Sequence, residues 1–254
     1  MSKVAVITGC TSGIGKELCA LYRADGYEVV GMARTAVAPD IAVDVTDCDA
    51  VKAAVDEAAA RYGHIDVAIA CAGAGLSGAT ELLPINEVKH QTELCYTGAL
   101  WFADCVLKHM GRGGKLIFIS SACAIFALPY RATYCASKAA VNMAAHGLYM
   151  ELKPHGIRVT AVCPGDIKTG FTANRVKYSD GGERYGGAPK ASADKIDGRE
   201  AKRMALKPAA KKIYKCCVKC RKPLYIVGAK YKFLDFLRRV LPRKFFLDVT
   251  AKLF

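Results

Sequence analysis

A tyrosine and a lysine stand four residues apart in an apolar stretch, as Tyr134 and Lys138 of the segment Y-C-A-S-K. On a helix, residues at this spacing share one face. An ammonium group beside a phenol stabilises the phenolate and lowers the tyrosine pKa from about 10 toward the working range. The pair is therefore a candidate proton donor and acceptor at a carbonyl group, although ordinary pairs on helix surfaces have the same spacing.

A glycine-rich turn lies near the start of the chain. The segment Thr8–Gly15 reads T-G-C-T-S-G-I-G and follows the β-branched run Val4–Ile7. Glycines let the backbone approach a pyrophosphate closely, and the N-terminus of the following helix offers it free N–H groups. Any turn between a strand and a helix can contain glycine. The predicted strand before this segment and the predicted helix after it are therefore needed to indicate a phosphate-binding turn.

Two serines, Ser120 and Ser121, follow the apolar run Lys115–Ile119. In open α/β sheets the carboxyl ends of the strands face the ligand crevice. A hydroxyl there could hydrogen-bond a substrate oxygen, and a turn cap would use serine equally well.

The elements that must position these groups alternate along the chain. Strands are predicted at Val4–Ile7, Tyr27–Met32, Ile41–Val45, Val67–Ala70, Lys115–Ile119, Arg158–Cys163 and Leu224–Val227. Helices are predicted at Gly15–Ala24, Asp49–Tyr62, Glu87–His109, Tyr130–Lys153, Ala201–Cys220 and Lys230–Leu241. This alternation predicts an α/β fold, a single Rossmann-type, doubly wound parallel sheet of about seven strands.

Composition excludes several classes of protein. The chain has 254 residues, of which 52% are hydrophobic, so it can fill a globular core and is not broadly disordered. No run of 18 apolar residues and no signal-peptide pattern occurs, which favours a cytoplasmic protein. The twelve cysteines are mostly scattered through apolar segments, as expected for reduced, buried thiols. Only Cys216, Cys217 and Cys220 cluster, a weak zinc signal, and we expect no metal.

The positive charge is concentrated in the last quarter. The net charge is +14, and residues 195–254 hold 18 Lys/Arg against 4 Asp/Glu, while the rest of the chain is neutral. We expect a dinucleotide-binding catalytic domain at 1–228, with a mobile glycine-rich flap at 169–198, and an amphipathic extension at 229–254. Residues 230–254 could contact an anionic membrane surface or pack on the domain. No nucleic-acid module accompanies the charge, so nucleic-acid binding is not expected.

Together, the three motifs resemble the short-chain dehydrogenase/reductase family over about residues 3–170. The resemblance implies that Tyr134 protonates a carbonyl oxygen as hydride arrives, or takes the alcohol proton in reverse. It implies that Ser121, thirteen residues before Tyr134, holds that oxygen. Lys138 would bind the nicotinamide ribose and lower the Tyr134 pKa. Such chemistry needs no metal.

The resemblance also implies a set of cofactor contacts. These are Gly9, Thr11, Ser12, Gly13, Ile14, Gly15, Arg34, Asp44, Val45, Ala72, Gly73, Tyr134, Lys138, Pro164, Gly165 and Thr169. The end of the second strand, G-M-A-R-T, lacks the carboxylate that NAD-binding chains place there. Arg34 could pair with a 2′-phosphate, so NADP(H) is favoured over NAD(H).

Two departures from the family pattern put the site in question. The usual N-N-A-G is Ala70-Cys71-Ala72-Gly73 here, which removes two asparagine side chains. The usual asparagine of the long helix, part of a proton relay, is Cys95, and a thiol is a poor donor.

The leading expectation is a reversible NADP(H)-dependent reductase of a hydrophobic ketone or aldehyde, with lipid-, retinoid- or steroid-like substrates. A 3-oxoacyl-carrier-protein reductase and a non-catalytic dinucleotide sensor or scaffold are the alternatives. Family resemblance implies a homodimer or homotetramer formed through the two long helices.

Overall fold

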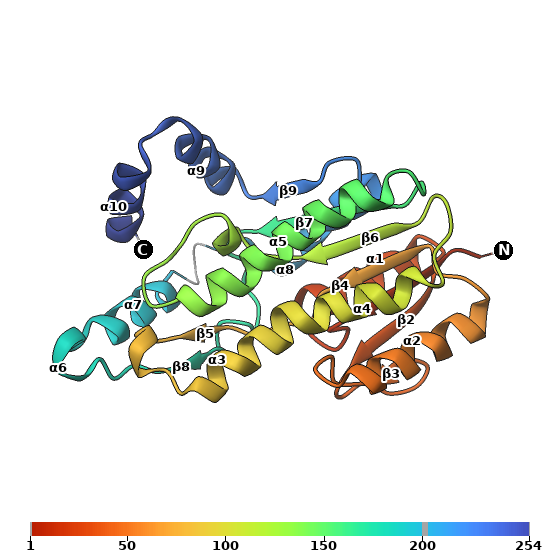
Figure 1. Ribbon diagram of the computed structural model, residues 1–254, viewed down its shortest axis with the longest axis horizontal. Coiled ribbons are helices and arrows are strands. Elements are labelled where there is room, and N and C mark those ends of the chain that lie inside the picture. The colour runs from red at the N-terminus through yellow and green to blue at the C-terminus, as the bar shows by residue number, and fades with distance from the viewer. Residues whose placement is uncertain (1, 200–202, 254) are drawn as a thin grey trace.

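A single parallel sheet organises the chain, whose computed structural model describes residues 2–199 and 203–253 (Figure 1). Within these residues, seven strands form the sheet in the order β3-β2-β1-β4-β6-β7-β9. The strands are β1 (Val4–Thr8), β2 (Glu28–Ala33), β3 (Ile41–Ala42), β4 (Val67–Ala70), β6 (Lys115–Ile119), β7 (Arg158–Pro164) and β9 (Leu224–Val227). In register, Val6 of β1 lies opposite Val30 of β2 and Ala68 of β4. The predicted fold class is confirmed.

Helices cover both faces of the sheet. On one face lie α2 (Cys48–Tyr62), α4 (Gly98–Leu107) and α5 (Ala132–Leu152); on the other lie α1 (Gly13–Ala24) and α8 (Leu206–Lys219). Alternate residues of β1 point to opposite faces of the sheet. Val6 packs in the core under α2, α4 and α5, and Ala5 and Ile7 pack in the core under α1 and α8. The strands are nearly all apolar because both of their faces are buried.

The predicted strand Ile41–Val45 is too long. β3 ends at Ala42 because the Asp44 carboxylate accepts hydrogen bonds from the Thr46 N–H (3.0 Å) and Thr46 Oγ1 (2.8 Å), which form a turn. No helix separates β2 from β3 in this described stretch, where only nine residues lie between Arg34 and Asp44.

The predicted helix Glu87–His109 is interrupted. It consists of α3 (Ile85–Thr92), a π-helical turn (Glu93–Thr97) and α4. Gly98 begins α4 where a Cβ would lie 2.5 Å from the Val45 carbonyl oxygen, so only glycine allows this backbone contact. The helix predicted from Tyr130 begins at Ala132, because Tyr130 adopts a left-handed conformation with φ 57°.

The segment predicted as a mobile flap has ordered structure of its own. It contains β8 (Val176–Lys177), α6 (Gly182–Tyr185) and α7 (Ala188–Asp197), and β8 pairs with β5 (Leu76–Ser77) in a small second sheet. The predicted helix start at Ala201 lies outside the described residues.

The basic tail forms α9 (Ala229–Val240) and α10 (Arg243–Leu253), separated by Pro242. Tyr231, Leu234 and Phe246 of these helices pack on Ala122 and Phe126, which follow β6. In Figure 1 the two helices stand at the edge of the molecule, beyond β9. Among the helices described, not one combines the length and apolar character needed to cross a membrane.

Candidate active site

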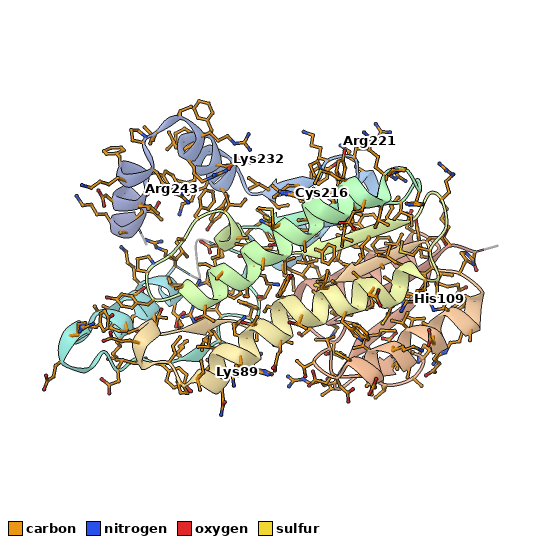
Figure 2. All side chains as sticks on the ribbon, in the orientation of Figure 1. Lys89, His109, Cys216, Arg221, Lys232 and Arg243 are labelled. Carbon is orange, nitrogen blue, oxygen red and sulfur yellow. The ribbon has the colours of Figure 1, made fainter. Side chains whose placement is uncertain are left out.

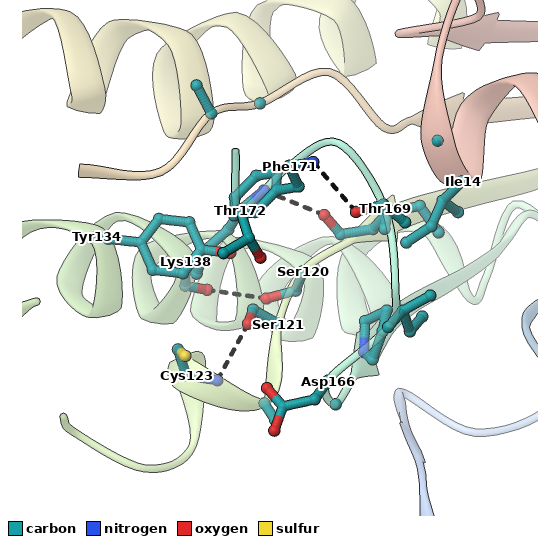
Figure 3. A pocket seen from close by; sticks show the side chains of 18 of the residues that line it. Ile14, Ser120, Ser121, Cys123, Tyr134, Lys138, Asp166, Thr169, Phe171 and Thr172 are labelled. Carbon is teal, nitrogen blue, oxygen red and sulfur yellow. Dashed lines mark hydrogen bonds between the residues drawn. The ribbon is translucent and has the colours of Figure 1, made fainter. Parts of the chain in front are cut away.

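One pocket opens at the carboxyl ends of β1, β6 and β7, where ligands bind in open α/β sheets (Figure 3). It brings together three segments far apart in sequence. Its lining includes Ser12, Gly13, Ile14 and Gly15, the group Ser121, Tyr134 and Lys138, and Pro164, Gly165 and Thr169.

Helix α5 places Tyr134 and Lys138 on its buried face, 6% and 5% exposed. Lys138 Nζ donates to the Ile119 carbonyl oxygen at the end of β6 (3.1 Å). Ser120 Oγ donates to the backbone oxygen of Lys138 (3.1 Å), which ties β6 to the helix. Ser121 is the other serine, and its Oγ accepts from the Cys123 N–H (3.1 Å) and interacts with the phenol of Tyr134. The geometry therefore separates an anchoring Ser120 from a pocket-facing Ser121.

Burial raises the pKa of Tyr134 well above its ordinary value, and the nearby Cys123 raises it further. The Ser121 hydroxyl and the charge of Arg131 act in the opposite direction. Tyr134 is thus a protonated phenol at neutral pH, which suits a proton donor. The lowering of its pKa by Lys138 stays a prediction.

Cys123 departs from the scattered, buried thiols that the sequence predicts, because its side chain is only half-buried. Cys123 lines the pocket, and a hydrogen bond from the Cys135 thiol lowers its pKa to about 7, against the effect of burial. The charge of Arg131 lowers this pKa further. No spacing rule in the sequence relates Cys123 to Cys135, since the contact depends on how the segment after β6 meets α5.

The glycine-rich turn has the geometry of a phosphate cradle. Gly9 and Gly13 have φ of 71° and 51°, and a Cβ on Gly15 would lie 2.2 Å from the Gly9 oxygen. The Ser12 side chain does not cap α1, and no acidic residue stands in the first turn of that helix. The N–H groups and positive dipole end of α1 are thus directed at the pocket, and the cradle fits a dinucleotide pyrophosphate.

A second, smaller pocket lies beside the first and is lined by Arg34 and Asp44. Burial raises the pKa of Asp44, but hydrogen bonds from Thr46 and the charge of Arg34 outweigh it and lower the pKa overall. Arg34 is itself exposed, where a 2′-phosphate could reach it.

Not every residue predicted to bind cofactor lines these pockets. Val45 is buried in the core, Thr11 lies against Thr35 (Oγ1–Oγ1 3.5 Å), and Gly9 and Ala72 pack against each other and line neither pocket. Ala72 still has a supporting role, because its N–H and that of Cys71 donate to Thr8 Oγ1 (3.1 and 2.9 Å). These bonds join the β4 loop to the glycine-rich turn without either missing asparagine.

Sequence reasoning also missed two residues near the site. The Asp40 carboxylate accepts from the Gly31 N–H of β2 and pairs with Arg23, both at 2.8 Å, so its charge is compensated. Tyr231 of the tail helix α9 lines the main pocket and hydrogen-bonds Asp166. A Cβ on Gly165 would lie 2.0 Å from the Tyr231 ring, so glycine is required there. A hydrophobic pattern alone could not assign a tail residue to the pocket wall.

Comparison with known proteins agrees with this geometry. Residues 3–179 match the family described as short chain dehydrogenase. A 3-ketodihydrosphingosine reductase of Bacteroides thetaiotaomicron is 37% identical over 180 residues, 68% of this chain and 67% of the relative. Dehydrogenase/reductase SDR family member 7B of Rattus norvegicus is 28% identical over 272 residues, 98% of this chain and 81% of the relative.

Solved structures extend the similarity to nearly the whole chain. A short-chain dehydrogenase from Streptomyces avermitilis superposes with a TM-score of 0.80 at 25% identity, covering 94% of this chain and 95% of that chain. An actinorhodin polyketide ketoreductase with NADPH gives a TM-score of 0.76 at 27% identity, covering 91% and 97%. The chain therefore belongs to the short-chain dehydrogenase family and is an oxidoreductase of CH–OH and C=O groups that uses NAD(P).

Proposed function

We propose that this protein is an NADPH-dependent reductase of a hydrophobic ketone or aldehyde, acting through Ser121, Tyr134 and Lys138. The observation that carries the proposal is the convergence of these side chains in one pocket beside a phosphate cradle. Part of the wall of that pocket is apolar, with Phe126, Leu128, Phe171, Ile196 and Tyr231, and the charged residues Arg131, Asp166 and Arg203 line it as well. Such a wall favours a substrate with a large apolar part.

NADPH, when bound, supplies the hydride. The Ser121 hydroxyl donates a hydrogen bond to the carbonyl oxygen and orients it toward the phenol of Tyr134. Tyr134 transfers its proton to that oxygen as negative charge develops there. Lys138 would hold the ribose hydroxyls of the cofactor, and its positive charge would stabilise the tyrosinate left after the proton transfer. Because burial raises the Tyr134 pKa, the phenol is protonated near neutral pH, which is the form that must give the proton to the carbonyl oxygen during reduction.

A lipid-like substrate is favoured by the apolar part of the wall and by the similarity to the 3-ketodihydrosphingosine reductase of Bacteroides thetaiotaomicron. A 3-oxoacyl-carrier-protein reductase is the enzymatic alternative, since a basic surface would suit an acidic carrier protein. The two differ in a measurable way, because a carrier-protein reductase would strongly prefer the protein-bound thioester to a free long-chain ketone.

The experiment that tests the proposal follows the hydride itself. NADPH deuterated at the transferring position of C4 is incubated with the protein and a long-chain aliphatic ketone. Deuterium at the carbinol carbon of the product supports the proposal, whereas the sensor or scaffold hypothesis predicts binding of NADPH without any labelled alcohol.

Arg34 is proposed to recognise the 2′-phosphate of NADP(H). Replacing Arg34 with glutamine should weaken NADPH binding about tenfold and leave NADH binding unchanged, because only NADPH has the group that Arg34 contacts. Fluorescence titration with both cofactors measures this, with Lys153→Gln as a control for the loss of one exposed cation outside both pockets. Equal weakening of both cofactors would contradict this role for Arg34.

We further propose that α9 and α10 contact an anionic membrane surface from the cytoplasmic side. Phe233, Phe236 and Val240 are 58–61% exposed, at spacings that place them on one face of α9. Phe245, Leu247 and Leu253 of α10 are also exposed. Residues 229–253 carry seven Lys/Arg and two Asp, and Figure 2 labels Lys232 and Arg243 on these helices. Cations beside exposed aromatic side chains complement an anionic headgroup layer.

A homodimer through the α4 and α5 face is the proposed assembly, with a homotetramer as the larger form. Helix α5 exposes Met143 and Met150, at 71% and 67%, two turns apart on the same side. Light scattering on the purified protein would give twice or four times the chain mass, and a monomer mass at micromolar concentration would contradict the proposal.

A further inference from the structure

The asparagine that the family pattern places in the long helix is Cys95 here, and its thiol faces a backbone carbonyl group that needs a hydrogen-bond donor. Cys95 is fully buried in the π-helical turn Glu93–Thr97. Its Sγ lies 3.4 Å from the Ala74 carbonyl oxygen. The Ala74 residue is half-buried, so its carbonyl has limited access to water and needs a donor, and a thiol is a weak one.

Gln91, one helical turn before Cys95, supplies a much better donor. The residue is 4% exposed, and its Nε2 donates both to the Ala74 carbonyl oxygen (3.1 Å) and to Cys95 Sγ (2.9 Å). The carboxamide thus contacts the loop after β4 and the thiol together. Both Nε2 hydrogens have acceptors, so the side chain is held in one orientation.

The loop that Gln91 holds borders the catalytic lysine. Gly73, next to Ala74, is packed so closely that a Cβ there would lie 3.3 Å from both Cys95 Sγ and Lys138 Nζ. Gly73, Ala74 and Lys138 all line the main pocket. A chain of contacts therefore runs from Gln91 through Ala74 and Gly73 to Lys138.

We propose that Gln91 is a positioning residue that provides the carboxamide absent at position 95 and holds Gly73–Ala74 against Lys138. Gln91 does not touch the reacting atoms; it acts through the backbone that would lie beside the nicotinamide ribose. The inference rests on the proposed function for its effect on turnover. A displacement of about 1 Å at such a loop can cost up to about a hundredfold in rate.

The test is a set of variants that moves the carboxamide. Gln91→Met keeps the length of the side chain and removes the donor; it should weaken NADPH binding and lower kcat, each by about tenfold. In the double variant Gln91→Met/Cys95→Asn, an amide at position 95 can donate to the Ala74 oxygen, so both quantities should return to within about threefold of the starting protein. Thr92→Val is the matched control, because that exposed hydroxyl bonds only to Val88 of its own helix (3.0 Å).

Two measurements keep the inference separate from the proposed function. Fluorescence titration with NADPH needs no turnover, so it reports on Gln91 even if no ketone is reduced. Failure of the proposed function would appear as no reduction by the starting protein, with the NADPH effect of Gln91→Met intact. Wild-type NADPH binding by Gln91→Met, or a loss that Cys95→Asn does not restore, would overturn the inference. If Gln91→Met does not fold, Gln91→Glu keeps the shape, lacks the donor and is judged by the same two outcomes.

Discussion

Replacement of Tyr134 with phenylalanine is expected to lower kcat for ketone reduction about 10³-fold, within the range of about 10²–10⁴ that a positioned acid contributes. The substitution removes only the hydroxyl. The ring stays packed near Phe171, whose centroid lies 5.8 Å from that of Tyr134. Steady-state reduction of a long-chain ketone with saturating NADPH measures the effect.

Measuring NADPH binding by Tyr134→Phe distinguishes loss of the proton donor from disruption of the whole binding site. The phosphate cradle, Arg34 and Lys138 are unchanged in Tyr134→Phe, so its Kd for NADPH should stay within about threefold of the starting value. Tyr130→Phe is the matched control, because Tyr130 lies in the same segment and does not line the main pocket. Turnover by Tyr134→Phe at the original rate would exclude Tyr134 as the proton donor.

Loss of three exposed phenylalanines is expected to reduce binding to anionic vesicles about a hundredfold. Phe233, Phe236 and Phe245 are 55–61% exposed, and partial burial of each in a bilayer interface would contribute about 1 kcal/mol. The triple variant Phe233→Ser/Phe236→Ser/Phe245→Ser should therefore remain in the supernatant when the starting protein sediments with vesicles containing phosphatidylglycerol. Binding should also weaken with added salt, because the cations of α9 and α10 contribute through screened attraction.

The controls address exposure and folding. Val37→Ser/Ile85→Ser removes apolar residues that are 79% and 64% exposed on other surfaces, and should sediment like the starting protein. The triple variant should still reduce a short, water-soluble ketone, because Tyr231, Leu234 and Phe246, which pack the tail on the domain, are untouched. Equal sedimentation of the triple variant and the starting protein would refute the membrane proposal.

Local patterns were sufficient to predict much of the fold and to identify candidate site residues that the structure brings into one pocket. The runs at Val4–Ile7 and Lys115–Ile119 identify strands because both faces of a parallel sheet are buried. Spacing alone places Tyr134 and Lys138 on one face of α5, since four residues make about one helical turn. The glycines at positions 9, 13 and 15 mark a turn that other residues would strain or obstruct.

What the sequence could not predict depends on tertiary contacts. The π-helical turn at Cys95 and the glycine contact at Gly98 arise where the helix meets other elements, and hydrophobic periodicity runs through both. Tyr231 reaches the pocket because α9 folds back over the segment after β6. Cys135 and Arg131 lower the pKa of Cys123, and only the folded structure brings their side chains close to it.

The most direct test of the central proposal is transfer of deuterium from C4 of labelled NADPH to a long-chain ketone, followed by mass spectrometry of the alcohol. Reduction by Ser121, Tyr134 and Lys138 predicts one deuterium at the carbinol carbon, formed by the starting protein and about 10³-fold more slowly by Tyr134→Phe. Tight binding of NADPH with no deuterated alcohol from any ketone, aldehyde or carrier-bound 3-oxo thioester would contradict catalysis and favour a dinucleotide sensor.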